Sequence, residues 1–282
     1  MHFGRVTNSP EQELSLPQDR RRTQSFLQLQ HQGRGELLVG APIWSCKEWQ
    51  GSFYPTDYQA GAYLEYYSRI FPCVEVNSTF YGLPAISQIH YWQRQVPGNF
   101  RFCPKLSKSL SHQPGRTDIV DELTTFCRHV EAFAENLGLC FIQFPENFSW
   151  KERDLLARLL KHLPQTLRWA VEFRHPSWFH DHMLHDELIN FLYRQNIATI
   201  ISDTPGRRDA LHFSLSQDQV MIRFLGQFPS PSDNHRLKAW HRRLSKWQDL
   251  GMDRIYFFIH QARHVTIPET CLYMQRLVTY GL

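Results

Sequence analysis

Short apolar runs alternate with helix-like segments from about residue 36 onward, and this alternation limits the fold more than any other feature of the sequence. The runs cover residues 37–39, 73–76, 100–105, 139–144, 169–173, 197–201, 220–225 and 255–259. Several of them, such as the run at 255–259, are apolar at every position, as parallel strands buried on both faces are. Eight strand-then-helix units in a stretch of this length predict an α/β fold, a TIM (β/α)8-type barrel formed as a single domain by residues 35–282.

The segments between these runs carry apolar residues at spacings of three and four, the pattern of helices that pack one face on a sheet. These stripes lie within residues 62–70, 86–96, 123–137, 155–163, 184–192, 237–250 and 272–277. The segment between Asp203 and Val220 lacks such a stripe, so the sixth unit is expected to be irregular. An open doubly wound sheet is the alternative fold, but neither a Gly-x-Gly-x-x-Gly nor a Walker loop follows any run.

The first 34 residues are rich in Gln, Arg, Ser and Pro and show no sustained periodicity. This composition predicts a flexible N-terminal arm over residues 1–34 that precedes the barrel. A short apolar patch of Phe26, Leu27 and Leu29 is the exception, and the alternative is that this patch docks on the barrel.

Composition excludes several classes of protein. With 282 residues, of which 42% are hydrophobic, the chain can bury a large core and is not disordered throughout. Its net charge of +4 is small for this length, so bulk charge does not indicate a nucleic-acid-binding protein. The six cysteines form no Cys-x-x-Cys pair, which argues against a zinc ribbon and predicts reduced cysteines in the core. Because no apolar run approaches the roughly 20 residues that span a bilayer, we expect a cytoplasmic protein without a membrane partner.

Polar residues gather where the predicted strands end. They are Glu75, Asn77, Lys105, Gln143, Glu172, Arg174, Asp203, Arg223 and His260. In TIM barrels the loops after the strands meet on one face, and active sites lie there. One interpretation is a structural lattice of salt bridges, since buried charges need partners. The concentration of these residues at one end of the strands favours a functional pocket instead.

The loops that follow add His112 and Tyr81 to this face. Cations that bind phosphate, together with rings that stack on sugars or bases, are suited to an anionic ligand. We therefore expect a small anionic or phosphorylated ligand as partner, with nucleic acid as the larger alternative.

Four motifs occur in order along the chain and together carry a family resemblance. They are Glu75-Val-Asn-Ser-Thr-Phe-Tyr-Gly-Leu-Pro, Phe100-Arg-Phe-Cys-Pro-Lys with a downstream Ser111-His112, Gln143-Phe-Pro, and Val171-Glu-Phe-Arg-His-Pro-Ser-Trp-Phe. From about residue 37 to residue 280 the chain resembles the YecE-like family, domain of unknown function 72. The resemblance implies a TIM barrel, and that family has no established reaction.

The residues that match the motifs of that family are Glu75, Asn77, Lys105, His112, Glu172, Arg174, His175, Asp203 and Arg223. The sequence departs from the family pattern in two places. The N-terminal arm lies outside the pattern, and the last strand ends in His260-Gln261 where many relatives carry Asn-Asn. The second departure weakens the case for a role of His260.

Three functional hypotheses follow from these residues. The first is a phosphoesterase or nuclease-like hydrolase, with a divalent metal held by Glu75, Glu172, Asp203 and His260. The second is a metal-free sugar or sugar-phosphate isomerase or epimerase. In this hypothesis Glu172 or Glu75 is the base, Lys105 or His175 is the acid, and Arg223 binds the anion. The third is a module that binds an anionic ligand or nucleic acid without turnover.

The candidate residues are divided between catalysis and substrate binding. The predicted catalytic residues are Glu75, Lys105, Glu172 and Asp203, and the predicted substrate-binding residues are Asn77, Tyr81, His112, Arg174, His175 and Arg223. His175 is also a second candidate for the acid. Because His175 precedes a proline, the alternative is that its ring only hydrogen-bonds the backbone of a tight turn.

Overall fold

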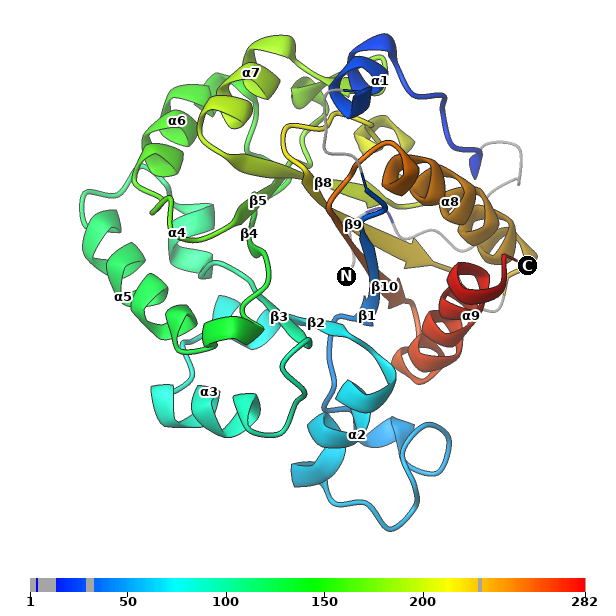
Figure 1. Cartoon of the computed structure of the whole chain (residues 1–282). Helices are drawn as coiled ribbons and strands as arrows, with labels where there is room; N and C mark the ends of the chain where they lie inside the picture. Colours follow the sequence, from blue (N-terminus) through cyan, green and yellow to red (C-terminus); the bar gives the residue numbers. More distant parts are fainter. Residues whose placement is uncertain (1–3, 5–13, 29–32, 228–229, 282) are drawn as a thin grey trace.

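A barrel of eight parallel strands forms the centre of the protein (Figure 1). The computed structural model describes residue 4 and residues 14–28, 33–227 and 230–281. The strands are β1 (Glu36–Ala41), β2 (Cys73–Val76), β3 (Arg101–Pro104), β4 (Cys140–Gln143), β5 (Trp169–Glu172), β8 (Ile197–Asp203), β9 (Gln219–Gly226) and β10 (Arg254–Gln261). They follow one another in the order β3-β2-β1-β10-β9-β8-β5-β4. Isolated bridges between Lys105 and Phe141 and between Phe102 and Leu137 join the two ends of this order, so the sheet nearly closes. The predicted TIM-type barrel is confirmed.

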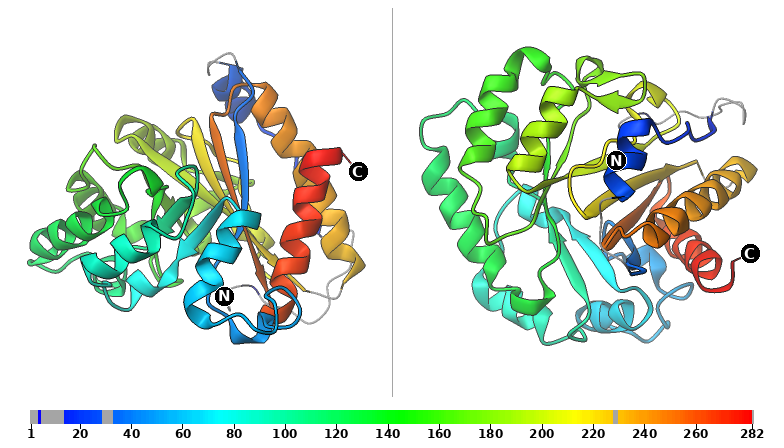
Figure 2. Two further views of the ribbon diagram at one scale, coloured as in Figure 1. Left: turned by 60° about the horizontal axis from the view of Figure 1, so that its bottom comes forward. Right: turned by 45° about the horizontal axis from the view of Figure 1, so that its top comes forward.

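Helices surround the barrel where the apolar stripes predict them. They are α2 (Tyr63–Ile70), α3 (Ile86–Gln93), α4 (Lys108–His112), α5 (Ile119–Glu131), α6 (Arg153–Lys161), α7 (Asp186–Arg194), α8 (Pro231–Asp249) and α9 (Ile267–Tyr280). Among them, the short α4 is an additional helix that no stripe predicted. Figure 2 shows α8 and α9 side by side on the outer face of β1 and β10. A small antiparallel hairpin of β6 (Phe179–His180) and β7 (Met183–Leu184) precedes α7. Nowhere in the described ranges is a helix both long and apolar enough to cross a membrane.

The sixth unit is irregular, as predicted. All residues between β8 and β9 are described, and the helical element among them is a single 3-10 turn, Arg208–Ala210. The place on the outer wall that a full helix would fill lies between α7 and α8. A helix from the N-terminal segment, α1 (Arg21–Gln28), occupies this place (Figure 1).

Contacts on both sides hold α1 there. Arg22 Nη2 donates to Asn190 Oδ1 of α7 at 2.6 Å. Just before the helix, Asp19 accepts hydrogen bonds from Arg243 Nη1 at 2.7 Å and Trp247 Nε1 at 3.1 Å, both on α8. The N-terminal segment therefore completes the ring of helices.

The expectation of a flexible arm has to be corrected for residues 14–28. Leu27 is completely buried, Leu14 is 2% exposed, and Thr23 Oγ1 donates to the Phe213 carbonyl oxygen at 2.6 Å. The alternative that the apolar patch docks is confirmed for Leu27 and for Phe26, which packs on the same core. The remaining residue of that patch, Leu29, and residues 1–3, 5–13 and 30–32 of the arm lie outside the described residues.

The core has two parts, one between the sheet and the helices and one inside the barrel. The inner part consists of Cys73, Cys103, Leu139, Phe141, Ala170, Ala198, Ile200, Met221, Tyr256 and Phe258. All six cysteines are buried and free of disulfides, in agreement with the prediction of reduced core cysteines. Alternate residues of a strand share a face, so the residue two positions after each inner-core residue also points into the barrel.

Candidate functional site

A layer of polar side chains lies directly above the inner core, toward the C-terminal ends of the strands. Each member follows an inner-core residue by two positions and therefore faces the barrel interior. The members are Glu75, Lys105, Gln143, Glu172, Ser202, Arg223 and His260, and we call them the polar layer. The Arg223 guanidinium lies 5.3 Å from the centre of the Phe141 ring beneath it. Barrel interiors are usually filled by branched aliphatic residues, so this layer needs a chemical explanation.

Arg223 of β9 is the centre of the layer and is 2% exposed. Its Nε and Nη2 donate to Glu75 Oε1 at 2.8 Å and Oε2 at 3.0 Å, as a bidentate pair. Its Nη1 donates to Glu172 Oε2 at 2.6 Å and to Gln143 Oε1 at 2.8 Å. One guanidinium thus binds carboxylates from opposite sides of the barrel.

Arg174 lies just after β5 and also binds the Glu172 carboxylate, on the side toward the C-terminal ends of the strands. Its Nε donates to Glu172 Oε1 at 2.8 Å and its Nη2 to Gln143 Oε1 at 2.8 Å. Gln143 therefore accepts from both arginines, although sequence reasoning assigned it no role. Its place at the end of a predicted strand, in the Gln143-Phe-Pro motif, is the feature of the sequence that could have indicated a role in the site.

The arginines set the charge state of the two carboxylates. Burial alone would raise the pKa of Glu172, but the charges of Arg174 and Arg223 outweigh burial and lower it to about 2. Burial alone would also raise the pKa of Glu75, but the charge of Arg223 outweighs burial and holds this pKa well below its usual value. Both carboxylates are ionised at neutral pH, and both are poor proton acceptors.

Two neutral groups complete the surroundings of Glu75. His260 Nε2 lies 3.1 Å from Glu75 Oε1, and Asn77 Nδ2 lies 2.9 Å from Oε2 and 3.0 Å from the Pro42 carbonyl oxygen. Burial lowers the pKa of His260 to about 4. Since an ionised carboxylate only accepts hydrogen bonds, neutral His260 donates through Nε2. The predicted substrate-binding residue Asn77 thus orients the Glu75 side chain.

Lys105 is the member of the polar layer that differs most from the others. It is 7% exposed, and its Nζ lies 3.8 Å from the centre of the Phe80 ring. In the described part of the chain, no carboxylate oxygen lies within ion-pair distance of this nitrogen. Burial and the neighbouring charge of Arg223 lower the pKa of Lys105 to about 7, against the weaker opposing effect of Glu172.

The Phe80 ring separates Lys105 from two further predicted binding residues. Tyr81 and His112 contact Phe80 edge-on, with ring centres 5.1 and 5.3 Å away. Burial and the Lys105 charge lower the pKa of His112 to about 4, so His112 is neutral at pH 7. Tyr81 is 84% exposed and projects from the loop after β2.

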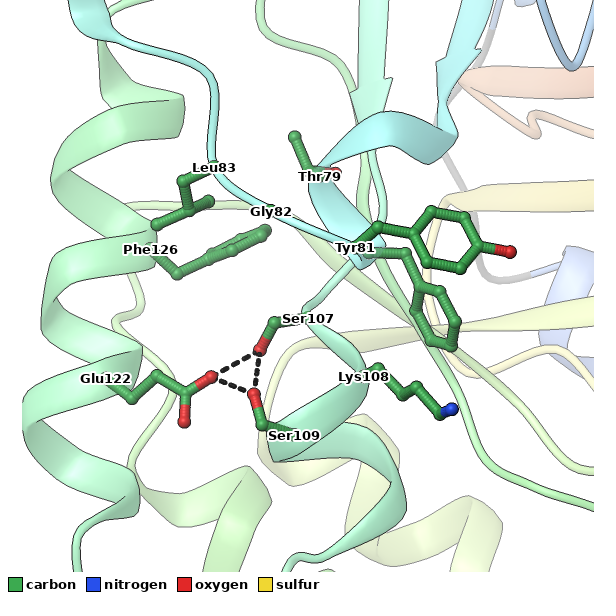
Figure 3. A pocket seen from close by; sticks show the side chains of 10 residues that line it. Thr79, Tyr81, Gly82, Leu83, Ser107, Lys108, Ser109, Glu122 and Phe126 are labelled. Carbon is green, nitrogen blue, oxygen red and sulfur yellow. Dashed lines mark hydrogen bonds between the residues drawn. The ribbon is translucent and has the colours of Figure 1, made fainter.

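A cavity of about 330 Å³ lies next to these rings. Figure 3 shows the side chains that line it. Tyr81 and Lys108 border it, and Phe126 lies in its wall. On the opposite side, Ser107 and Ser109 both donate hydrogen bonds to Glu122. Tyr81 and His112 are therefore near the polar layer without belonging to it.

Asp203 does not join the polar layer, and this prediction has to be corrected. On β8 the inward positions are Ala198, Ile200 and Ser202, so Asp203 is one residue out of phase and points outward. There its carboxylate binds three partners of the outer wall. They are Arg208, Arg236 at 2.9 Å and Trp240 at 2.7 Å. Arg236 and Trp240 were not predicted. Trp240 belongs to the apolar stripe of residues 237–250, and Arg236 directly precedes this stripe.

His175 takes the role that was the alternative to substrate binding. Its Nδ1 accepts from the Ser177 backbone N–H at 3.1 Å and caps the 3-10 turn Pro176–Trp178. Substrate binding through its other ring nitrogen stays a prediction.

The four predicted metal ligands do not converge. Asp203 is on the outer wall, while Glu75 and Glu172 are held apart by Arg223. Across the described ranges, no group of three or more His, Cys, Asp and Glu side chains is arranged to hold a metal ion.

Fold and polar layer together define a class of protein, a TIM-like barrel with a buried ionic cluster at its C-terminal face. The family model described as "Protein of unknown function DUF72" matches residues 38–281, and the chain belongs to this family. The UPF0759 protein YecE of Escherichia coli K12 is 27% identical over 251 residues, which cover 83% of this chain and 89% of YecE. The UPF0759 protein YunF of Bacillus subtilis 168 is 24% identical over 206 residues, which cover 68% of this chain and 70% of YunF.

Solved structures of the family have the same fold. A DUF72 family protein of Thermotoga maritima MSB8 aligns with a TM-score of 0.70 at 24% identity, over 86% of this chain and 98% of its own. A DUF72 family protein of Enterococcus faecalis V583 aligns with a TM-score of 0.69 at 19% identity, over 88% and 99%. At these identities the likeness concerns the fold alone.

Proposed function

We propose that the mouth of the barrel binds a small anionic carbonyl compound, such as a sugar phosphate, and catalyses proton transfer on it without a metal. The observation that carries this proposal is Lys105. A buried amine in a layer of otherwise paired charges, with a pKa of about 7, can donate or accept a proton near neutral pH. This proposal corresponds to an isomerase- or epimerase-like enzyme.

Two features support an anionic ligand. The cations of Arg174, Arg223 and protonated Lys105 stand against the carboxylates of Glu75 and Glu172, so an added negative charge is balanced. The second feature is a neighbouring hydroxyl. Ser202 Oγ is buried in the layer and has no hydrogen-bond partner among the described residues. A buried hydroxyl of this kind is usually satisfied by water or a ligand.

A metal-dependent phosphoesterase fits this donor set less well. The oxygens of Glu75 and Glu172 already accept hydrogen bonds from arginines, and a cation at the same oxygens would meet those positive charges. Because its pKa is strongly lowered, Glu172 is a poor proton acceptor and is not the base in this proposal. Its role is to position Arg174.

The first prediction concerns Arg174, which stands at the outer edge of the layer. We expect Arg174→Gln to weaken binding of dihydroxyacetone phosphate by about tenfold or more, since a hydrogen bond to a charged group contributes about 1.5–3 kcal/mol. Isothermal titration calorimetry measures the dissociation constant. Arg158→Gln, the same change on the exposed face of α6, is the matched control and should bind as the unaltered protein does. Equal affinities of all three proteins, or no binding to any of them, would contradict the proposal.

The second prediction concerns pH. Because Lys105 carries its proton below about pH 7 and loses it above, anion affinity should fall as the pH rises from 6 to 9. Sulfate is the probe, since its own charge is constant over this range. In Lys105→Met the affinity should be lower at pH 6 and nearly independent of pH. A Lys105→Met variant with the pH profile of the unaltered protein would assign the titration to another group.

A further inference from the structure

We infer that Lys105 is a nucleophile whose Nζ forms an imine, a Schiff base, with the carbonyl carbon of the ligand. This inference rests on the proposed function, because it assigns the ligand class and the covalent step of the same site. It goes further in one respect. A proton-transfer residue only needs to reach the ligand, whereas a nucleophile needs an unprotonated nitrogen with an unblocked lone pair.

The backbone of Lys105 is fixed on both sides. Its N–H donates to the Val76 carbonyl oxygen at 3.2 Å, and its carbonyl oxygen accepts from Thr79 Oγ1 at 2.7 Å. Its bridge to Phe141 lies where the two ends of the sheet meet. The side chain therefore starts from a rigid point and follows the barrel interior up to the Phe80 ring.

The end of this side chain is held without an ion pair. Nζ packs at 3.8 Å over the Phe80 ring, which is an aromatic face and takes up no lone pair. Glu75 and Glu172 are the nearby carboxylates, and their oxygens are bound by Arg223 and Arg174. Both carboxylates are thus already bound by arginines, and among the described residues neither forms an ion pair with Lys105.

The groups that face Lys105 act in opposite directions. Glu172 on β5, Glu75 on β2 and the Phe80 ring favour the protonated amine, but burial together with the arginines outweighs them. Arg223 comes from β9 and Arg174 from the end of β5, and both repel a second positive charge. Neighbouring His112 on α4 is neutral at pH 7. With a pKa of about 7, about half of the Lys105 amine is unprotonated at neutral pH. An ordinary lysine is unprotonated to only about 0.04% under these conditions. Desolvation next to another cation is a recognised way of activating a lysine for Schiff-base chemistry.

The step balances without a cofactor. The Nζ lone pair attacks the carbonyl carbon while the C=O π electrons move to the oxygen, and one proton of the amine passes to that oxygen, so a neutral carbinolamine forms. Loss of water then gives the imine, and proton uptake gives its iminium form. The iminium nitrogen withdraws electrons from the adjacent carbon, so a proton on that carbon becomes easier to remove. The positive charge of the iminium lies where protonated Lys105 would have it, beside Glu75 and Glu172.

The ligand must then combine two chemical groups, a carbonyl that reaches Nζ and an anion that reaches the arginine side of the layer. Phosphate and carboxylate both satisfy this requirement at Arg174. A keto sugar phosphate and a 2-keto acid are therefore the two forms to compare, with dihydroxyacetone phosphate and pyruvate as probes.

Borohydride trapping tests the inference. The full-length protein is incubated at pH 7 with either probe, sodium borohydride is added, and the modified residue is located by peptide mass spectrometry. We expect reductive labelling of Lys105 at least tenfold above Lys108, which is exposed on the same face and is the internal control for accessibility. Dihydroxyacetone lacks the phosphate and should label Lys105 at least tenfold less than its phosphate ester. The probe that labels faster identifies the anionic group.

Lys105→Arg separates the imine from simple binding. It keeps a positive charge but has no primary amine, so trapping should disappear while sulfate affinity at pH 6 stays within about threefold. Circular dichroism confirms that the variant is folded. If it is not folded, the site of labelling in the unaltered protein still decides.

The outcomes distinguish this inference from the function on which it rests. An unaltered protein that binds phosphate in calorimetry but gives no adduct at Lys105 would overturn the imine and leave the anion site. Equal labelling of Lys105 and Lys108 would show an unselective reaction and overturn it as well. An adduct at Lys105 that forms equally with and without phosphate would retain the nucleophile and refute the anionic ligand of the proposed function.

Discussion

Arg223→Met should lower the free energy of unfolding by about 3–5 kcal/mol at pH 7, the range measured when one partner of a buried ion pair is removed. Arg223 binds Glu75 and Glu172, and both carboxylates are completely buried. Without the guanidinium they must either stay charged in a medium of low polarity or take up protons. Urea unfolding followed by circular dichroism measures the loss, and Arg158→Met on the exposed face of α6 should change stability by less than about 0.5 kcal/mol.

The same variant should show an altered dependence on pH. In the unaltered protein the folded-state pKa of Glu172 is lowered to about 2. The ionised Glu172 carboxylate therefore stabilises the folded state above its unfolded-state pKa, and this stabilisation is lost as the pH falls toward 2. In Arg223→Met, Glu172 keeps Arg174, but Glu75 loses its guanidinium partner. Burial should then raise the folded-state pKa of Glu75, so its protonation stabilises the folded state. The difference in stability between the two proteins should therefore shrink from pH 7 to pH 5. Adding Glu75→Gln and Glu172→Gln should restore part of the loss. A loss below about 1 kcal/mol would contradict the description of the polar layer as an interdependent ionic cluster.

Leu27→Ala should destabilise the protein by about 2–5 kcal/mol, because it removes a completely buried side chain from the helix that replaces the missing sixth helix. Ser25→Ala is exposed on the same helix and is the control, with an expected change near zero. Urea unfolding measures the global effect. Hydrogen exchange of residues 21–28 shows whether α1 detaches by itself. An unchanged unfolding midpoint together with rapid exchange of α1 in the unaltered protein would mean that the segment is not part of the cooperative fold.

The sequence predicted best the features that depend on short continuous stretches of the chain. All eight strands follow from apolar runs, since a buried parallel strand must be apolar on both faces. The lack of a stripe after Asp203 predicted the irregular sixth unit. The docking of α1 could not be predicted with the same ease. Its contacts depend on Asn190, Phe213 and Trp247, which lie far away in the sequence.

Some of the candidate residues lie together in the structure, and one of them does not. Glu75, Lys105, Glu172 and Arg223 meet inside the barrel because each lies two residues after an inner-core residue, toward the C-terminal end of its strand. Asp203 also ends a strand, but it is one position out of phase, and the inward residue is Ser202. Comparing each candidate with the residue two positions earlier would have separated the two cases. The pairing of both glutamates with Arg223 depends on the closed barrel, and no local pattern announces it.

The position of α1 has a consequence for the order in which the chain can fold during synthesis. Arg22 and its partner Asn190 are 168 residues apart, and Asp19 and Trp247 are 228 residues apart. On the ribosome, a helix made among the first elements must therefore wait for its binding surface until nearly the whole barrel has emerged. Until then the apolar side of α1 stays exposed, and so does the wall that it later covers. The nascent protein should depend on chaperones through most of translation. Its release from these chaperones should coincide with the docking of α1 on the barrel.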